Sequence, residues 1–123
     1  MKEKAKMKPA LYRVLSPSPD GYYTAYIGRS NGDITRRLRS HFVTHHKFQK
    51  QLPLHIETKV EYAEFDTVAD MYVAEIVYIN LEKPPFNVDD KAPDKLTLNV
   101  DLSGIEWKPW EKTHLLDKWR NTV

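Results

Sequence analysis

The first half of the chain carries three segments with the patterns of β-strands. Leu11–Leu15 is a short apolar stretch, and Tyr22–Ile27 is rich in aromatic and β-branched side chains, so we expect a strand in each. Ser16–Gly21 lies between them and is dense in Ser, Pro and Gly, which predicts a six-residue loop. His55–Ala63 alternates between charged and largely apolar positions, which predicts a third, half-buried strand.

Two other segments follow the period of an α-helix. Asp33 can cap a first helix, whose inner face includes Leu38. Asp66 or Thr67 can cap a second helix that runs to about Leu81. This second helix is apolar nearly all round, which predicts that it is buried on all sides.

The last part of the chain predicts one more strand and one more helix. Leu96–Leu102 alternates in the manner of a strand, and Pro109 suits the first turn of a last helix. The elements therefore follow the order ββαβα, with a strand and a helix added after it. This order favours the α+β class with an antiparallel sheet, in one domain of 123 residues.

Composition excludes several classes of protein. The chain has no cysteine, which excludes disulfides, thiolate zinc sites and cysteine nucleophiles. It has no apolar stretch of about 18 residues, so we expect no segment that spans a membrane. Residues 1–9 are strongly charged, which predicts a loose basic arm and not a secretory signal. Together these features favour an intracellular protein.

The charges are distributed unevenly along the chain. Residues 1–50 carry eleven Lys or Arg against three Asp or Glu, whereas residues 51–123 carry eight against fourteen. Two interpretations stay open at this point. Either the basic arm accounts for the excess, or the first half forms a basic face that suits a polyphosphate such as nucleic acid.

Glu75 is the first candidate for chemistry. On a helical wheel it lies between apolar residues such as Met71 and Ile79. A carboxylate in that position needs a cation, a hydrogen-bond donor or a metal. It is therefore either paired with a core lysine or arginine, or a ligand for a hard ion such as Mg²⁺.

Arginine and tyrosine side chains are the next candidates. Arg37 lies toward the inner face of the first helix beside His41, where it can reach solvent or neutralise a phosphate. Tyr12 and Tyr26 lie in the two predicted strands of the hairpin. Each either packs in the hairpin core or places a phenolic hydroxyl near a phosphate.

These candidates belong to an ordered set of motifs. In chain order the set comprises Ala10-Leu11-Tyr12, Tyr26-Ile27-Gly28, Arg37, His41, Glu75 and Pro84-Pro85-Phe86-Asn87. Its order and spacing resemble those of the GIY-YIG nuclease domain, over about residues 10–87. Ala10 and Leu11 replace the first glycine and the isoleucine of that pattern. Residues 88–123 then form a C-terminal extension outside the resemblance.

The resemblance implies a three-stranded antiparallel sheet flanked by helices, and cleavage of DNA with Mg²⁺ or Mn²⁺. It implies that Glu75 binds the metal and that Arg37 steadies the scissile phosphate. Tyr12 and Tyr26 would position or deprotonate the attacking water. His41 is an alternative base, because histidine titrates near neutral pH, and the choice of base stays open. Such a nuclease would be cytoplasmic or associated with the nucleoid.

Five further residues are expected to bind the substrate or to organise the site: Gly28, Arg29, Arg36, Arg39 and Asn87. Arg37 is preferred to Arg36 as the phosphate ligand because it shares a face with Leu38. The alternative to an enzyme is an inactive domain of the same fold that binds nucleic acid or protein.

Three tryptophans lie in the C-terminal extension, at Trp107, Trp110 and Trp119. They predict either core packing of this extension against the sheet or a surface for a homodimer or a protein partner.

Overall fold

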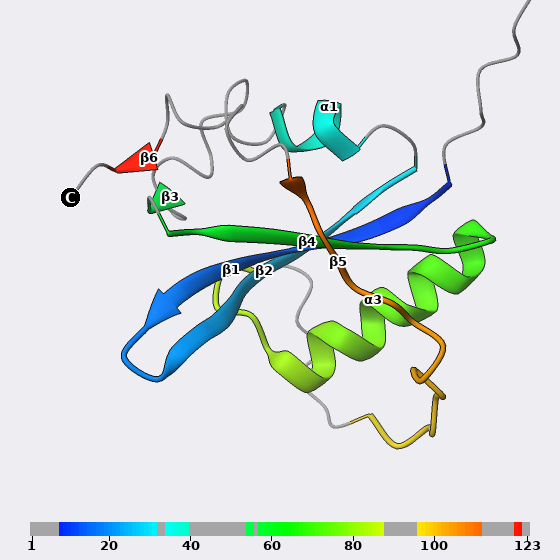
Figure 1. Cartoon of the computed structure of the whole chain (residues 1–123). Coiled ribbons are helices and arrows are strands. Elements are labelled where there is room, and N and C mark those ends of the chain that lie inside the picture. The colour runs from blue at the N-terminus through cyan, green and yellow to red at the C-terminus, as the bar shows by residue number, and fades with distance from the viewer. Residues whose placement is uncertain are drawn as a thin grey trace, which may run out of the picture.

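A computed structural model of the chain describes residues 8–31, 34–39, 54–55, 57–87, 96–111 and 120–121. Among them, two helices flank a four-stranded antiparallel sheet, so the fold belongs to the α+β class, as predicted (Figure 1). The strands follow the order β2-β1-β4-β5 across this sheet. Their bounds are Ala10–Ser18 for β1, Gly21–Ser30 for β2, Lys59–Glu64 for β4 and Lys108–Pro109 for β5.

The hairpin of β1 and β2 is longer than the sequence predicts. The prediction of a loop over Ser16–Gly21 is wrong, because β1 continues to Ser18 and only Pro19 and Asp20 form the turn. Pro17 is tolerated in β1 because the pairing of β1 with β4 ends at Leu15. Beyond that point β1 pairs with β2 alone among the described strands, and a missing backbone N–H costs little on the side that β4 has left.

The predicted strand His55–Ala63 is divided in the structure. β4 begins at Lys59 and pairs with β1, whereas Leu54–His55 form the separate strand β3. β3 pairs in parallel with β6, Arg120–Asn121, so the end of the chain returns beside it (Figure 1).

Helix α3, Val68–Glu82, confirms the second predicted helix. Thr67 caps its start, since the backbone N–H of Asp70 donates to the Thr67 hydroxyl over 3.0 Å. It ends at Glu82, because the next residue, Lys83, has a left-handed conformation that caps the helix. Two prolines follow Lys83, and proline cannot continue a helix.

The prediction from its apolar sequence that α3 is buried on all sides is wrong. One face packs on the sheet through Met71 and Ala74, whereas Val73 and Ile76 are exposed to 48% and 56%. The reason is geometric. A helix laid on one face of a sheet contacts it along one stripe only, whatever its composition.

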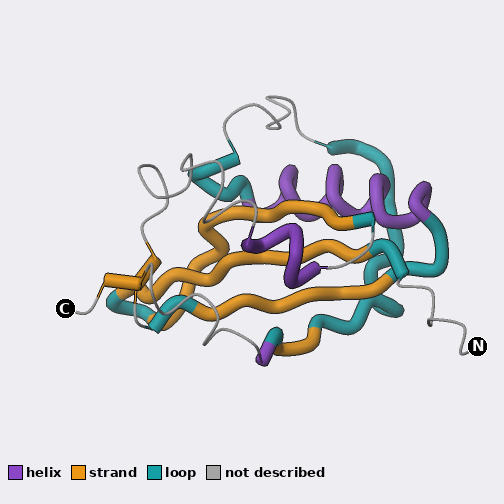
Figure 2. Tube along the Cα trace, turned by 90° about the horizontal axis from the view of Figure 1, so that it is seen from above, coloured by secondary structure: helices purple, strands orange, loops and turns teal. Residues whose placement is uncertain are grey.

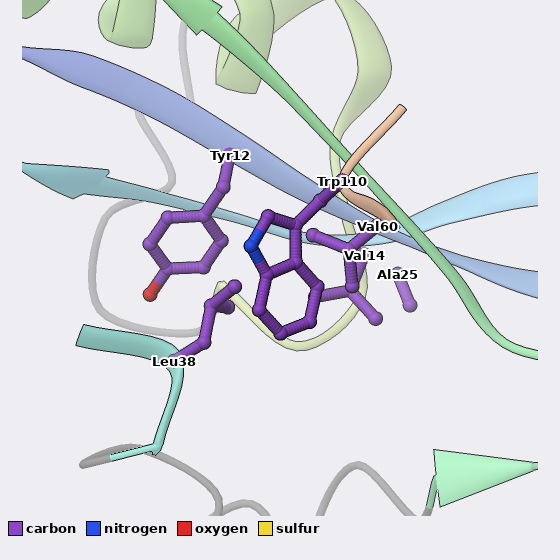
Figure 3. Close-up of a cluster of buried hydrophobic side chains, with 6 residues drawn as sticks. All are labelled: Tyr12, Val14, Ala25, Leu38, Val60 and Trp110. Carbon is purple, nitrogen blue, oxygen red and sulfur yellow. The ribbon is translucent and has the colours of Figure 1, made fainter. Parts of the chain in front are cut away.

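Helix α1, Ile34–Arg39, lies on the opposite face of the sheet from α3 and confirms part of the first predicted helix (Figures 1 and 2). Leu38 is fully buried and packs in a core with Tyr12, Val14 and Trp110 (Figure 3). The proposed cap, Asp33, lies outside the described residues.

The C-terminal extension corrects two predictions. Leu96–Leu102 does not form a strand, and Leu98 is 74% exposed there. The free edge of β4 is taken instead by β5, so Pro109 lies in a strand and not in the first turn of a helix. The later part of the predicted helix lies outside the described residues.

Tryptophans of this extension anchor it on both faces of the sheet. Trp110 is 5% exposed in the core beside α1, and its indole N–H donates to Thr35. Trp107 packs edge-on against Tyr78 of α3. Core packing therefore holds for both residues, and Trp110 is not the exposed anchor that a partner surface through it would need. Trp119 lies outside the described residues.

In the described part of the chain, no helix has the length and apolar character required to cross a membrane.

Candidate functional site

Tyr12 and Tyr26 meet on the face of the sheet that α1 covers. In the register of the hairpin, Tyr12 lies opposite Gly28 and Tyr26 lies opposite Val14. The two tyrosines are thus diagonal neighbours on one face, where long side chains can touch. Their ring centroids are 6.2 Å apart, with the rings tilted by 38°. The pairing of strands therefore brings together the two tyrosines predicted from the motifs.

Gly28 provides the space that the Tyr12 ring occupies. A Cβ atom built on Gly28 would overlap the hydroxyl and ring of Tyr12 and lie 2.9 Å from its Cε1. The ring of Tyr12 thus crosses over the backbone of β2, at the outer edge of the sheet. The side chain that needs a glycine at position 28 is therefore that of Tyr12.

Arg37 reaches Tyr12 from α1, although its side chain is largely exposed. Burial raises the pKa of the Tyr12 hydroxyl well above its ordinary value of 10.0, and the nearby Tyr26 raises it further. The positive charge of Arg37 and its hydrogen bond to Tyr12 act in the opposite direction but do not outweigh burial. Tyr12 is therefore a neutral hydrogen-bond donor near neutral pH, and a poor proton acceptor.

Glu75 approaches the same edge from α3, on the other face of the sheet. Its side chain is only 10% exposed, and its Oε1 atom lies 2.7 Å from Nη1 of Arg29. The negative charge of Glu75 is close enough to raise the pKa of Tyr12, as the weakest of the contributions. Of the two alternatives for Glu75, the structure shows the pairing with a cation.

Tyr72 completes the surroundings of Arg29. The guanidinium carbon of Arg29 lies 4.9 Å from the centre of the Tyr72 ring. Tyr72 and Glu75 are three residues apart on α3, so they share one flank of the helix. The motifs did not indicate Tyr72, although its spacing from Glu75 was a usable signal.

Asn87 forms two hydrogen bonds with the outer edge of β2. The backbone N–H of Ile27 donates to Oδ1 of Asn87 over 2.8 Å, and Nδ2 of Asn87 donates to the Ile27 carbonyl over 2.7 Å. Asn87 is 2% exposed, so both bonds are shielded from water. Its amide thus pairs with Ile27 as a neighbouring strand would, which fits the expected role in organising the site.

The other predicted positions have simpler placements. Ala10 is paired in β1 between Ser30 and Glu64, without a positive φ, so this position does not require glycine. Arg36 is exposed on α1. His41 and the side chain of Arg39 lie outside the described residues.

Glu75 is the residue that could hold a metal. In the part of the chain that the structure describes, no three His, Asp or Glu side chains gather as a ligand set. Mg²⁺ is often bound by one or two carboxylates, with water and substrate phosphate completing its shell. A nearly buried carboxylate at a strand edge fits this kind of site, provided that the metal shares the carboxylate with Arg29 or replaces Arg29 on it.

No family model, no curated protein and no solved structure matches the chain.

Proposed function

We propose that this chain is a divalent-metal-dependent endonuclease that hydrolyses phosphodiester bonds in DNA, with a GIY-YIG-like site. One observation carries the proposal: Tyr12, Tyr26, Arg37 and Glu75, which come from two strands and from helices on both faces of the sheet, converge at the edge of β2. These are the groups that the resemblance assigns to catalysis, and their convergence is independent of sequence spacing.

The electrostatics of this edge suit a phosphate. Arg37 presents a guanidinium beside the Tyr12 hydroxyl, and a guanidinium can bind two phosphate oxygens at once. Exposed Arg36 adds positive charge, which supplies affinity for a nucleic-acid backbone, and Arg29 would add more if its pair with Glu75 were exchanged for a phosphate. A divalent ion held by Glu75 would offset negative charge on the phosphate and the leaving oxygen.

The raised pKa of Tyr12 decides its proposed role. A phenol that stays protonated can donate a hydrogen bond but does not take a proton from water. Tyr26, which is only partly buried, and His41 are the remaining candidates for the base.

The ion pair of Glu75 with Arg29 favours one alternative. A domain of this fold whose carboxylate is permanently neutralised by an arginine would bind nucleic acid without cutting it. Such a domain would show salt-sensitive binding with no dependence on a divalent ion.

A plasmid assay tests the proposal. Supercoiled DNA is incubated with pure protein and Mg²⁺ or Mn²⁺, with EDTA as the metal-free reference, and the open-circle and linear products are measured. We expect cleavage that falls at least about 100-fold in Glu75→Gln, since loss of even an indirect metal partner costs up to that much. Glu82→Gln is the matched control, because Glu82 is a carboxylate of the same helix that pairs with Arg13 instead.

Two results would contradict the proposal in different ways. Equal cleavage by Glu75→Gln and the parent would mean that the metal does not sit on Glu75. Binding in a gel shift without any cleavage, on plasmid and on branched or single-stranded DNA, would favour the inactive domain.

A further inference from the structure

Arg29 makes at least two contacts, which differ in kind. Its Nη1 atom donates to Glu75 over 2.7 Å, and its guanidinium lies over the ring of Tyr72 at 4.9 Å. The Arg29 side chain is 49% exposed, whereas that of Glu75 is 10% exposed. Arg29 is therefore the solvent-accessible partner of the pair, and it already occupies Oε1 of a carboxylate that is nearly buried.

A metal on Glu75 and the present position of Arg29 conflict. Mg²⁺ binds carboxylate oxygen at about 2.1 Å. An ion bound to Oε1 would then lie within about 5 Å of the guanidinium nitrogen, and two positive charges at that spacing repel each other. Binding of the ion thus requires Arg29 to move away from that oxygen.

Tyr72 limits how far Arg29 moves. The attraction between a guanidinium and an aromatic ring does not depend on Glu75, so it persists after the ion pair is broken. Arg29 also starts in the edge strand β2, directly after Gly28 and opposite Leu11 of β1. A displaced Arg29 would therefore stay beside the site, where a phosphate can take the place of the carboxylate as its partner.

We propose that Arg29 occupies the metal position on Glu75 in the resting protein and that a divalent ion must displace it. The inference rests on the proposed function, because it takes Glu75 as the metal ligand. It adds a regulatory consequence: the free protein binds the ion weakly, and a nucleic acid that draws Arg29 onto its phosphate favours loading of the metal at the same time.

Binding of Mn²⁺ alone tests this competition without any catalytic readout. The full chain is titrated with Mn²⁺ in the absence of nucleic acid, and the free ion is followed by its electron paramagnetic resonance signal. Arg29→Met keeps the length of the side chain but removes its charge, and we expect it to bind Mn²⁺ about fivefold more tightly than the parent. Arg29→Lys, which keeps the charge, should stay closer to the parent.

Two matched variants make the result specific. Arg36→Met removes the same charge from an exposed position of α1, so it measures the general effect of charge, which should be less than about twofold. Glu75→Gln should weaken binding at least about tenfold. Thermal unfolding of each variant establishes that all are folded.

The outcomes separate the two ideas. Tighter binding in Arg29→Met alone, lost in Glu75→Gln, supports the competition. Parent-like binding in Arg29→Met together with loss in Glu75→Gln overturns the competition but leaves the metal on Glu75. An equal gain in Arg36→Met also overturns it, since charge alone would explain the change. Unchanged binding in Glu75→Gln removes the metal assignment itself.

Discussion

Two arginines on the α3 side of the sheet have similar surroundings and differ in how firmly they are held. Arg13 pairs with Glu61 at 2.6 Å and Glu82 at 3.3 Å, and lies 4.2 Å from the centre of the Trp107 ring. Arg29 pairs with Glu75 at 2.7 Å and lies 4.9 Å from the Tyr72 ring. The Arg13 side chain is 20% exposed and that of Arg29 is 49% exposed.

The position of each strand explains the difference. Arg13 is on β1, which has neighbours on both sides, so a cross-strand partner in β4 and the end of α3 both reach it. Arg29 is on the edge strand β2, which pairs with β1 alone among the described strands and otherwise contacts Phe86 at Ala25 and Asn87 at Ile27. The same side-chain chemistry thus forms a more buried pair in the middle of the sheet and a more accessible pair at its edge.

Removal of each arginine should give the largest difference in stability between the two positions. We expect Arg13→Met to lower the free energy of unfolding by about 2 to 3 kcal/mol, because two partly buried carboxylates lose their partner. Arg29→Met should cost less than about 1 kcal/mol, since its pair is half exposed. Chemical denaturation of both variants measures the two losses side by side.

Similar losses in the two variants would contradict the distinction, because Arg29 would then be a structural joint like Arg13. Glu61→Gln provides the control from the carboxylate side. It should reproduce part of the loss seen in Arg13→Met, without changing the binding of Mn²⁺.

A second, smaller effect concerns space at the site rather than charge. Gly28→Ala should cost about 2 kcal/mol, because the new methyl group overlaps the ring of Tyr12, which is 1% exposed and cannot swing aside. Gly104→Ala is the control, since no atom lies within 4 Å of a Cβ at that position. It should change the free energy of unfolding by less than about 0.5 kcal/mol.

The physical reason for that loss can be tested by a double mutant. In a Tyr12→Leu background the added methyl group meets a smaller side chain, so Gly28→Ala should cost less than in the parent. An equal cost in both backgrounds would mean that the backbone of Gly28, and not its contact with Tyr12, sets the penalty.

Local signals in the sequence predicted those elements that depend on local chemistry. The start of α3 at Thr67 and its end before Pro84 follow from a capping hydroxyl and from proline geometry. The strand expected at Leu96–Leu102 failed because alternation shows only that a segment suits a sheet edge. Whether an edge is free depends on the whole topology, and the two residues of β5 occupy it here.

The same distinction between local signals and overall packing applies to the candidate site. The motifs indicated Tyr12, Tyr26, Arg37 and Glu75 together, and the structure brings them to one edge. The pairing of Arg29 with Glu75 could not be predicted, because 46 residues separate them and the contact depends on where α3 lies on the sheet. Residue type marked the candidates, and only the packing of elements decided their partners.

The smallest expected effect comes from the buried hydroxyl of Tyr12 and appears only in alkali. Its pKa is raised in the folded protein, so the folded state keeps a proton that the unfolded chain releases near pH 10. The resulting stability is complete below about pH 10 and is lost as the pH rises toward the folded pKa. Between about pH 9 and pH 10.5 we expect the parent to lose about 1 kcal/mol more than Tyr12→Phe in denaturant titrations. Parallel curves for the two proteins would mean that Tyr12 titrates as it does in the unfolded chain. The hydroxyl would then be open to water, and Tyr12 would again be a candidate for the base.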